Sequence, residues 1–161
     1  PSDRKHEGLI QTSSIKNNSV LTIYNLLTQI GFFNSNEASR QTRNYVNKLS
    51  IKVSDIDNFV MNLSGGNQQK VVIAKWLAKK CKILLFDEPT KGIDVAAKAQ
   101  IWKLIDEYTK EGGSVIVASN EIPELINNCD RIITLQKGKI NNTYDFNDFN
   151  EHQISLSISS N

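Results

Sequence analysis

The sequence predicts an α/β fold that combines a portion of a parallel β-sheet with a mainly helical region. Short apolar runs at residues 82–89, 114–119 and 131–136 have the length of strands, and helical patterns separate them. Residues 1–60 are polar and show the apolar spacing of helices. Strands that alternate with helices indicate a parallel sheet, whose ligands lie beyond the carboxyl ends of the strands.

The composition limits the chain to one domain or two closely packed subdomains and excludes several classes of function. Its 161 residues are 39% hydrophobic, enough for one moderate core. The net charge of +2 is small and the charges are interspersed, so we expect no nucleic-acid partner. No apolar run reaches the ~18 residues of a membrane span. Cys81 and Cys129 lie in no CxxC pattern, and we interpret them as reduced structural thiols.

The first sixty residues contain two predicted helices. One covers residues 17–32, where Gly31 is well placed to end it. The other covers residues 34–51, with Ser35 or Asn36 as the N-cap. The inward positions are Val20, Ile23, Leu27 and Ile30 in the first helix and Ala38, Thr42, Tyr45, Val46 and Leu49 in the second.

A connector at residues 50–62 leads into a helix, a strand and a further helix. Residues 71–78 are nearly all apolar, so this helix should be buried on most sides. The run at residues 82–89 closes with acids and a proline, which is typical of a buried parallel strand that ends at a functional edge. Asp94 is a good N-cap for the next helix, and Gly112–Gly113 end it. The inner stripe of that helix is Ile101, Leu104, Ile105 and Tyr108.

The remaining elements are predicted to extend the parallel sheet. A strand at residues 114–119 precedes a short helix at 121–128, and the next strand, at 131–136, ends in a turn at Lys137–Gly138. Residues 141–161 are rich in Asn and Ser without a clear period, so we interpret them as a peripheral strand or a loose tail.

The segment LSGGNQQK, residues 63–70, predicts an anion site at the start of a helix. Ser64 can cap the helix, and Gly65 and Gly66 allow backbone N–H groups to approach a ligand closely. The helix dipole favours negative charge at this end. The segment therefore suits the γ-phosphate of a nucleotide.

Asp87 and Glu88 follow directly after an apolar strand, so both carboxylates should emerge at the sheet edge. The first acid of such a pair can hold Mg²⁺, and the second can polarise a water for attack on a phosphoryl group. A solvated pair at a strand end is the simpler alternative. The preceding LSGGNQQK segment favours the catalytic interpretation.

These segments resemble the ATPase subunits of ABC transporters. LSGGNQQKVVIAKWLA resembles their signature motif, ILLFDEPTKGIDV their Walker B strand and D-loop, and SVIVASNEIPELINNCDRIITLQKGKI their switch region and the strands that follow. The NQQK ending, the GIDV after DEPT and the opening PSDRKHEGL are more narrowly similar to the second nucleotide-binding domain of simple-sugar importers, of the ribose, galactose and xylose type. The resemblance implies a partial P-loop NTPase domain of the ABC type.

The resemblance assigns the signature residues to a site that two domains share. It implies that Ser64, Gly65 and Gly66 bind the γ-phosphate of an ATP held by the opposite domain, with Gln68 nearby. These residues would complete the partner's site.

The same resemblance assigns chemistry to the residues after the Walker B strand. It implies that Asp87 supports Mg²⁺, that Glu88 is the general base, and that Asp94 is the D-loop acid at the interface between domains. Asn120 stands at the switch position, where most ABC ATPases have histidine. Asparagine can hydrogen-bond a phosphate but gains no positive charge near neutral pH.

By this resemblance, residues 1–161 are the C-terminal portion of one nucleotide-binding domain. Residues 13–80 would be the helical subdomain with the signature motif, 81–145 would carry Walker B, the D-loop and the switch region, and 146–161 would be a tail. No GxxxxGK[ST] loop occurs in the sequence, and the glutamine loop is expected before Pro1. We therefore expect this segment alone to be inactive as an ATPase.

The resemblance implies the motor subunit of an importer that uses ATP and Mg²⁺ at the cytoplasmic face of the membrane. Its partners would be a second nucleotide-binding domain and membrane permease subunits, with a solute-binding receptor acting indirectly. A simple sugar is the expected cargo. Alternatives are a nucleoside or other small-solute importer, a degenerate regulatory half that completes the partner's ATP site, and a non-transport ABC ATPase.

Overall fold

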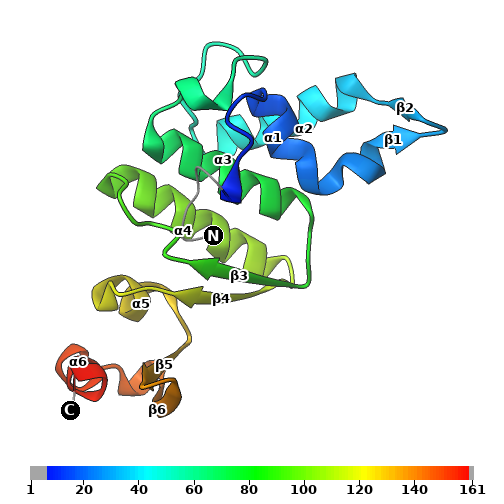
Figure 1. The fold of residues 1–161 in the computed structure, drawn as a ribbon. Helices are drawn as coiled ribbons and strands as arrows, with labels where there is room; N and C mark the ends of the chain where they lie inside the picture. Colours follow the sequence, from blue (N-terminus) through cyan, green and yellow to red (C-terminus); the bar gives the residue numbers. More distant parts are fainter. Residues whose placement is uncertain (1–6, 160–161) are drawn as a thin grey trace. The chain divides into compact units, whose positions relative to one another are not determined.

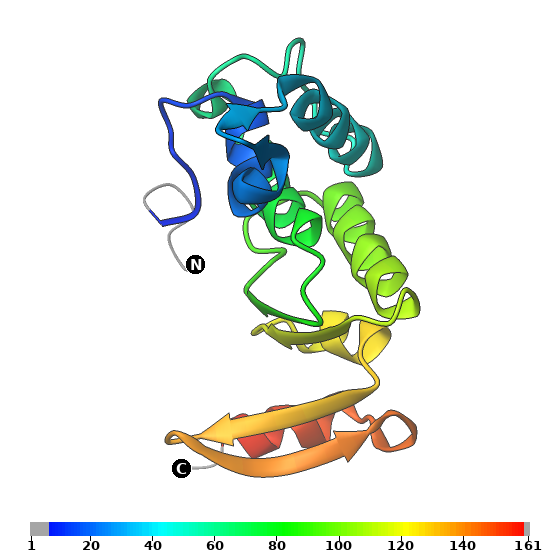
Figure 2. The ribbon, with the colours of Figure 1, turned by 90° about the vertical axis from the view of Figure 1, so that its right-hand side faces the viewer.

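The computed structural model describes residues 7–159 and divides the chain into two compact units, unit 1 at residues 1–118 and unit 2 at residues 119–161. In Figures 1 and 2, the helices α1, α2 and α3 gather at one end of unit 1, while β3 and β4 lie at its other end. Residues 1–6, which belong to the opening segment of the resemblance, lie outside the described residues.

The first predicted helix is much shorter than expected. Helix α1 covers Ile15–Val20, a 3-10 helix follows at Leu21–Leu27, and the strands β1 (Thr28–Gln29) and β2 (Phe32–Phe33) then form an antiparallel hairpin. The prediction of one helix over residues 17–32 is therefore wrong.

The hairpin forms because its turn and its strands both favour it. Ile30 and Gly31 have φ angles of 49° and 81°, and two residues with positive φ suit the twist of a tight hairpin. Gly31 thus makes the turn and does not end a helix. Phe33 stacks on Tyr24 with ring centroids 4.8 Å apart, which holds the hairpin against the 3-10 helix.

Helix α2 covers Ser35–Lys48, and Asn34 caps it, one residue before the predicted Ser35 or Asn36. The Asn34 side chain accepts a hydrogen bond from the Glu37 N–H at 3.0 Å. The inward positions predicted for these helices are confirmed by burial at Val20, Ile23, Leu27, Ala38, Thr42 and Leu49. Ile30, on the hairpin turn, is 97% exposed.

Helix α3 (Gly65–Ala78) is the central helix of unit 1 and is buried on most sides, as predicted. It contacts α1, α2 and α4 (Val95–Lys110). Asp94 caps α4, and Gly112, with φ 94°, lies at its end, so both predicted boundaries are confirmed.

The strands β3 (Ile83–Asp87) and β4 (Ser114–Ala118) pair in parallel, as predicted, in register from Ile83–Ser114 to Asp87–Ala118. Helix α4 packs against β4. The expectation that residues 82–89 form a fully buried strand is wrong: Leu84 is buried, whereas Leu85 is 77% exposed. Successive strand residues point to opposite faces of the sheet. The alternation of buried and exposed residues therefore shows that, within residues 7–118, only one face of the pair is covered.

Unit 2 begins with α5 (Ile122–Asn128) and continues with β5 (Arg131–Gln136) and β6 (Lys139–Asp145). The strand β5 pairs with β6 in an antiparallel hairpin, so its expected place in the parallel sheet is wrong. The predicted turn at Lys137–Gly138 is confirmed, and both residues have positive φ.

The last residues are more ordered than a loose tail. A 3-10 helix at Phe146–Asp148 precedes α6 (Glu151–Ser159), which packs on β5 and β6. Ile154 and Ser157 are the buried positions of α6, and the Ser157 hydroxyl bonds Thr134 Oγ1 on β5 at 3.1 Å.

Two features of the described residues concern the cysteines and the membrane. Cys81 and Cys129 are free thiols, as expected. Among residues 7–159, no helix combines the length and the apolarity that crossing a membrane requires.

Candidate functional site

Ser64 is the N-cap of α3, as the sequence predicted. Its Oγ accepts hydrogen bonds from the side-chain Nδ2 of Asn67 at 3.0 Å and from the Asn67 N–H at 3.5 Å. The Asn67 Oδ1 in turn accepts the backbone N–H of Lys52 at 3.1 Å. The Asn67 side chain therefore links the exposed Ser64 hydroxyl to the connector at residues 50–62.

Gly65 and Gly66 form the first turn of α3 and leave its backbone N–H groups accessible to a ligand. The first N–H of this turn with a backbone acceptor is that of Gln68, which donates to the Ser64 carbonyl at 2.9 Å, while the Asn67 N–H faces the Ser64 hydroxyl. The first turn carries no acidic residue, so nothing in it offsets the positive end of the dipole. An anion fits this helix start.

Gln68 has a different position from the other signature residues. It is 4% exposed, and its Nε2 donates to the carbonyls of Val60 at 3.3 Å and Leu63 at 3.2 Å. Its Oε1 has no hydrogen-bond partner among residues 7–159. The side chain supports the loop before α3 from inside, and its nucleotide-binding role stays a prediction.

Asp87 ends β3 at the carboxyl edge of the parallel pair, and Glu88 follows it. Glu88 has φ 48°, a left-handed conformation that is strained for a residue with a side chain. Its N–H donates to the Ala118 carbonyl of β4 at 2.8 Å, which fixes the turn. Pro89 and Thr90 are buried directly behind it. Strain of this kind is found at functional sites, where the surrounding structure maintains it.

The helix start and the acidic turn lie side by side in unit 1. The Gln69 Nε2 donates to the Pro89 carbonyl at 3.1 Å. A Cβ placed on Gly66 would lie 3.4 Å from Ile93 Cγ2, so glycine allows the two segments to approach closely. The structure therefore brings the first turns of α3 close to the loop that follows β3, a contact that the sequence did not predict.

Asp94 caps α4 by accepting the Ala97 N–H at 2.9 Å. This hydrogen bond lowers the pKa of the Asp94 carboxyl, with a smaller contribution from the charge of Lys70. The carboxylate is exposed and therefore ionised at neutral pH. A D-loop role at an interface is compatible with its exposure and stays a prediction.

Sequence reasoning missed Asn67, Gln69 and Lys70, which connect α3 to its surroundings. The Lys70 ammonium is buried and donates to Gln100 Oε1 at 2.9 Å and to the Ser50 carbonyl at 3.3 Å. Burial lowers the pKa of Lys70. Gln69 and Lys70 lie three and four positions after Gly66, so their place near Gly66 on the helix could have been inferred, whereas the contacts with distant segments could not.

Asn120, the expected switch residue, lies in unit 2, between β4 and α5. The other predicted site residues belong to unit 1. The role of Asn120 therefore stays a prediction.

The acidic turn suits a cation that is bound mainly by a substrate. Among residues 7–159, no group of three or more His, Cys, Asp or Glu side chains could hold a metal ion. Mg²⁺ commonly binds one or two carboxylates together with substrate phosphates and water. The exposed carboxylate of Asp87 fits this mode.

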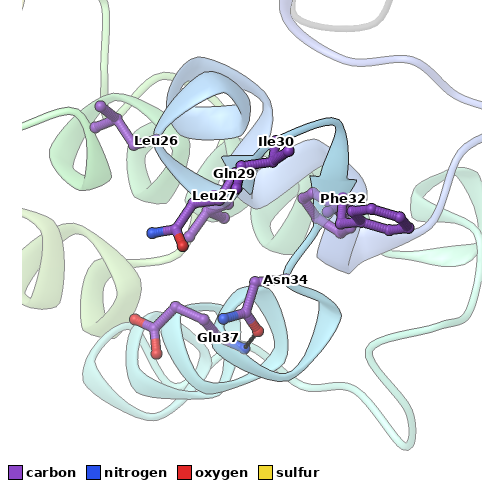
Figure 3. A pocket seen from close by; sticks show the side chains of 8 residues that line it. Leu26, Leu27, Gln29, Ile30, Phe32, Asn34 and Glu37 are labelled. Atoms are coloured by element: carbon purple, nitrogen blue, oxygen red, sulfur yellow. Dashed lines mark hydrogen bonds between the residues drawn. The ribbon is translucent and has the colours of Figure 1, made fainter.

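A separate pocket of about 470 Å³ lies beside the β1–β2 hairpin (Figure 3). Its walls are mainly apolar, and Asn34 and Glu37 at the start of α2 supply polar groups. Several of its apolar side chains are strongly exposed, including Ile30 at 97% and Phe32 at 82%. Exposed apolar patches of this kind mark interaction surfaces.

Comparison with known proteins identifies the family. Residues 3–91 match the family model described as ABC transporter. The chain is 46% identical over 140 residues to the ribose import ATP-binding protein RbsA 2 of Mesorhizobium japonicum, covering 87% of this chain and 28% of that protein. It is 41% identical over 152 residues to the xylose import ATP-binding protein XylG of Thermoanaerobacter pseudethanolicus, covering 94% and 30%. The chain thus spans less than a third of the length of these relatives.

Comparison with solved structures identifies the fold of an ABC transporter cassette. The dimeric structure of MJ0796, a bacterial ABC transporter cassette, superposes with a TM-score of 0.75 at 25% identity, covering 88% of this chain and 60% of that chain. Its post-hydrolysis state bound to ADP and phosphate superposes with a TM-score of 0.74 at 24% identity and the same coverage. Motifs, fold and family match agree, and the chain belongs to the ABC transporter family.

Proposed function

We propose that this chain supplies the signature segment and the catalytic carboxylates of an ATPase that drives the import of a simple sugar. The observation that carries the proposal is the Ser64-capped start of α3 beside the Asp87–Glu88 turn. Relatives named for ribose, xylose and arabinose import support the sugar as cargo.

The start of α3 would bind the γ-phosphate of an ATP held by a second cassette. The Ser64 hydroxyl and the N–H groups of Gly65 and Gly66 are donors, and phosphate oxygens only accept. The dimeric arrangement named for MJ0796 supports a site shared by two cassettes. In this assignment, the signature acts on its partner's nucleotide.

The acidic turn would serve the nucleotide of this chain's own cassette. Mg²⁺, when bound, neutralises phosphate charge, and Asp87 would hold it together with the phosphates. Glu88 would accept a proton from the water that attacks the γ-phosphate. The φ of 48° at Glu88 supports this role, because it aims the carboxylate from a fixed turn.

The partners of the complete protein would be a membrane permease and, through it, a solute-binding receptor. We place the ATPase at the cytoplasmic face of the membrane, with the helical part of unit 1 facing the permease. The apolar surface around Ile30 and Phe32 supports this orientation, since it offers an exposed patch for a protein partner.

A second candidate function is a regulatory half that completes its partner's site and hydrolyses little ATP itself. Asn120 favours it, because asparagine cannot provide the positive charge of a switch histidine. The presence of Asp87 and Glu88 favours hydrolysis by this chain's own cassette.

The two candidates are separated by the ATPase rate of the complete transporter that contains this chain. Ser64→Arg places a bulky side chain at the helix start. Glu88→Gln removes the base, and general-base catalysis typically contributes roughly 100-fold or more to the rate. For the first candidate, both variants lower the rate strongly. Loss with Ser64→Arg alone supports the regulatory half.

Matched controls are Ser54→Arg and Glu111→Gln, which make the same changes at exposed positions outside the site. Both controls should retain the parental rate. Full ATPase and sugar uptake in Ser64→Arg would contradict the assignment of the signature.

A further inference from the structure

Two hydrogen bonds in series end at the hydroxyl group of Ser64. The backbone N–H of Lys52 donates to Asn67 Oδ1 at 3.1 Å, and Asn67 Nδ2 donates to Ser64 Oγ at 3.0 Å. The Asn67 backbone N–H also points at the same oxygen, at 3.5 Å. Asn67 thus contacts the connector at residues 50–62 with one end of its amide and the signature serine with the other.

The direction of these bonds follows from the chemistry of the groups. A backbone N–H only donates, so the amide atom that faces Lys52 must be the oxygen, and the NH₂ group must face Ser64. The Ser64 oxygen then accepts from two N–H groups, which leaves its single hydrogen to point elsewhere. Within residues 7–159, this hydroxyl donates to no acceptor.

We propose that Asn67 is a positioning residue that holds the Ser64 hydroxyl as a hydrogen-bond donor toward the γ-phosphate of the ATP on the facing cassette. The proposal rests on the proposed function of Ser64. Phosphate oxygens accept and do not donate, so a hydroxyl fixed as a donor joins the N–H groups of Gly65 and Gly66 in one donor set.

A simpler role for Asn67 would be to fasten the connector to α3 through Lys52. The two roles differ in their dependence on Ser64. If Asn67 acts through the hydroxyl, its loss has no further effect once the hydroxyl is absent. If it only fastens the connector, its loss has the same effect with or without the hydroxyl.

The test is a double-mutant cycle in the complete transporter, with ATP as the probe. The kcat and KM for ATP hydrolysis and the Tm are measured for Asn67→Ala, Ser64→Ala and the double variant. Asn67→Ala should lower kcat/KM about 5- to 20-fold, the range of a misdirected charge-assisted hydrogen bond. In the Ser64→Ala background, the same change should alter kcat/KM less than about 2-fold.

Asn58→Ala is the matched control. It removes another Asn–Ser hydrogen bond, from Asn58 Nδ2 to Ser54 Oγ at 3.1 Å, at an exposed place outside the site. Its kcat/KM should match the parent. Effects of Asn67→Ala and Ser64→Ala that multiply in the double variant overturn the proposal, and so does an unchanged kcat/KM in Asn67→Ala.

Asn67→Asp gives a second test if Asn67→Ala does not fold. The carboxylate still accepts the Lys52 N–H but offers Ser64 no donor, so the hydroxyl turns inward to donate to it. The loss should be larger with Ser64 present than in the Ser64→Ala background, where charge repulsion alone remains. Equal losses in both backgrounds overturn the proposal.

The proposal and the underlying function fail in different ways. If Ser64→Arg abolishes ATPase while Asn67→Ala and Ser64→Ala have no effect, the signature binds phosphate without the Asn67 contact. If Ser64→Arg is also harmless, the proposed function itself is wrong.

Discussion

At the scale of single residues, Lys75 shows how a polar group is accommodated in the interior of unit 1. The residue lies on the buried side of α3 and is 5% exposed. Its ammonium donates to the Gly8 carbonyl at 2.6 Å, and its own carbonyl accepts the Thr22 hydroxyl. Lys75 therefore connects α3 to the start of the described chain and to the 3-10 helix. Burial lowers the pKa of its ammonium, because low polarity disfavours the charged form.

The lowered pKa of Lys75 predicts a pH dependence of stability. Between the native pKa and the ordinary 10.5, the unfolded chain binds the proton more tightly than the folded chain. The cost of burying the charge is therefore fully present below the native pKa and disappears as the pH rises to 10.5. The free energy of unfolding of the parent, relative to Lys75→Met, should therefore increase as the pH rises toward 10.5.

Urea unfolding of both proteins at several pH values measures this difference. Lys79→Met, an exposed lysine at the end of the same helix, is the control and should differ from the parent by a constant amount. A difference between parent and Lys75→Met that does not change with pH would contradict the burial argument.

Residue roles could be predicted from sequence where the chemistry is local. Ser64 and Asp94 could be predicted as caps, because the N–H that each one bonds lies only three residues ahead. The bonds from Gln69 to Pro89 and from Lys52 to Asn67 span 20 and 15 positions, so they depend on how distant segments meet. No periodicity in the sequence encodes that meeting.

At the scale of elements, α2, α3 and α4 were predicted well, whereas the helix expected over residues 17–32 and the partner of β5 were not. The start of α3 and both ends of α4 follow from caps and from the glycines after α4. The strand β5 pairs with β6 across a turn in which two residues have positive φ angles. The β6 segment is polar, so no pattern in the sequence indicated that it would be the partner strand. Helix α6 was missed because its apolar residues, Ile154, Leu156 and Ile158, alternate with serines, a spacing that is not helical.

The cap of α4 predicts how Asp94 variants separate stability from function. Asp94→Asn keeps an oxygen for the Ala97 N–H, whereas Asp94→Ala removes it. We expect the Tm to fall in Asp94→Ala and to stay near the parental value in Asp94→Asn. If the carboxylate also contacts the facing cassette, ATPase of the complete transporter falls in both variants.

Differential scanning fluorimetry and ATPase rates of the same samples provide the two measurements. Asp106→Ala, on the exposed side of α4, is the control for loss of an acidic side chain. A parental Tm in Asp94→Ala would show that the cap does not stabilise α4.

At the scale of the whole molecule, the chain contains two of the parts that a nucleotide site needs. The signature and the acidic turn lie in unit 1, and the 161 residues contain no GxxxxGK[ST] loop to hold the phosphates. Unit 2 adds the predicted switch residue Asn120. The relatives are more than three times as long as this chain.

The missing phosphate loop predicts that residues 1–161 alone show no measurable ATPase activity. A few hydrogen bonds from one helix start cannot replace the loop that holds and orients the phosphates. Phosphate release with ATP and Mg²⁺ should equal that of a buffer blank. Steady turnover that disappears in Glu88→Gln would contradict this prediction.

The left-handed backbone of Glu88 has a consequence for how the sequence can drift. Glycine adopts φ 48° without the roughly 1–2 kcal/mol that a side chain costs there, which offsets the ~1 kcal/mol that its flexibility adds to the unfolded chain. Replacing the acid by glycine would thus be nearly neutral for folding. Selection for stability alone would therefore not favour glutamate over glycine at this position.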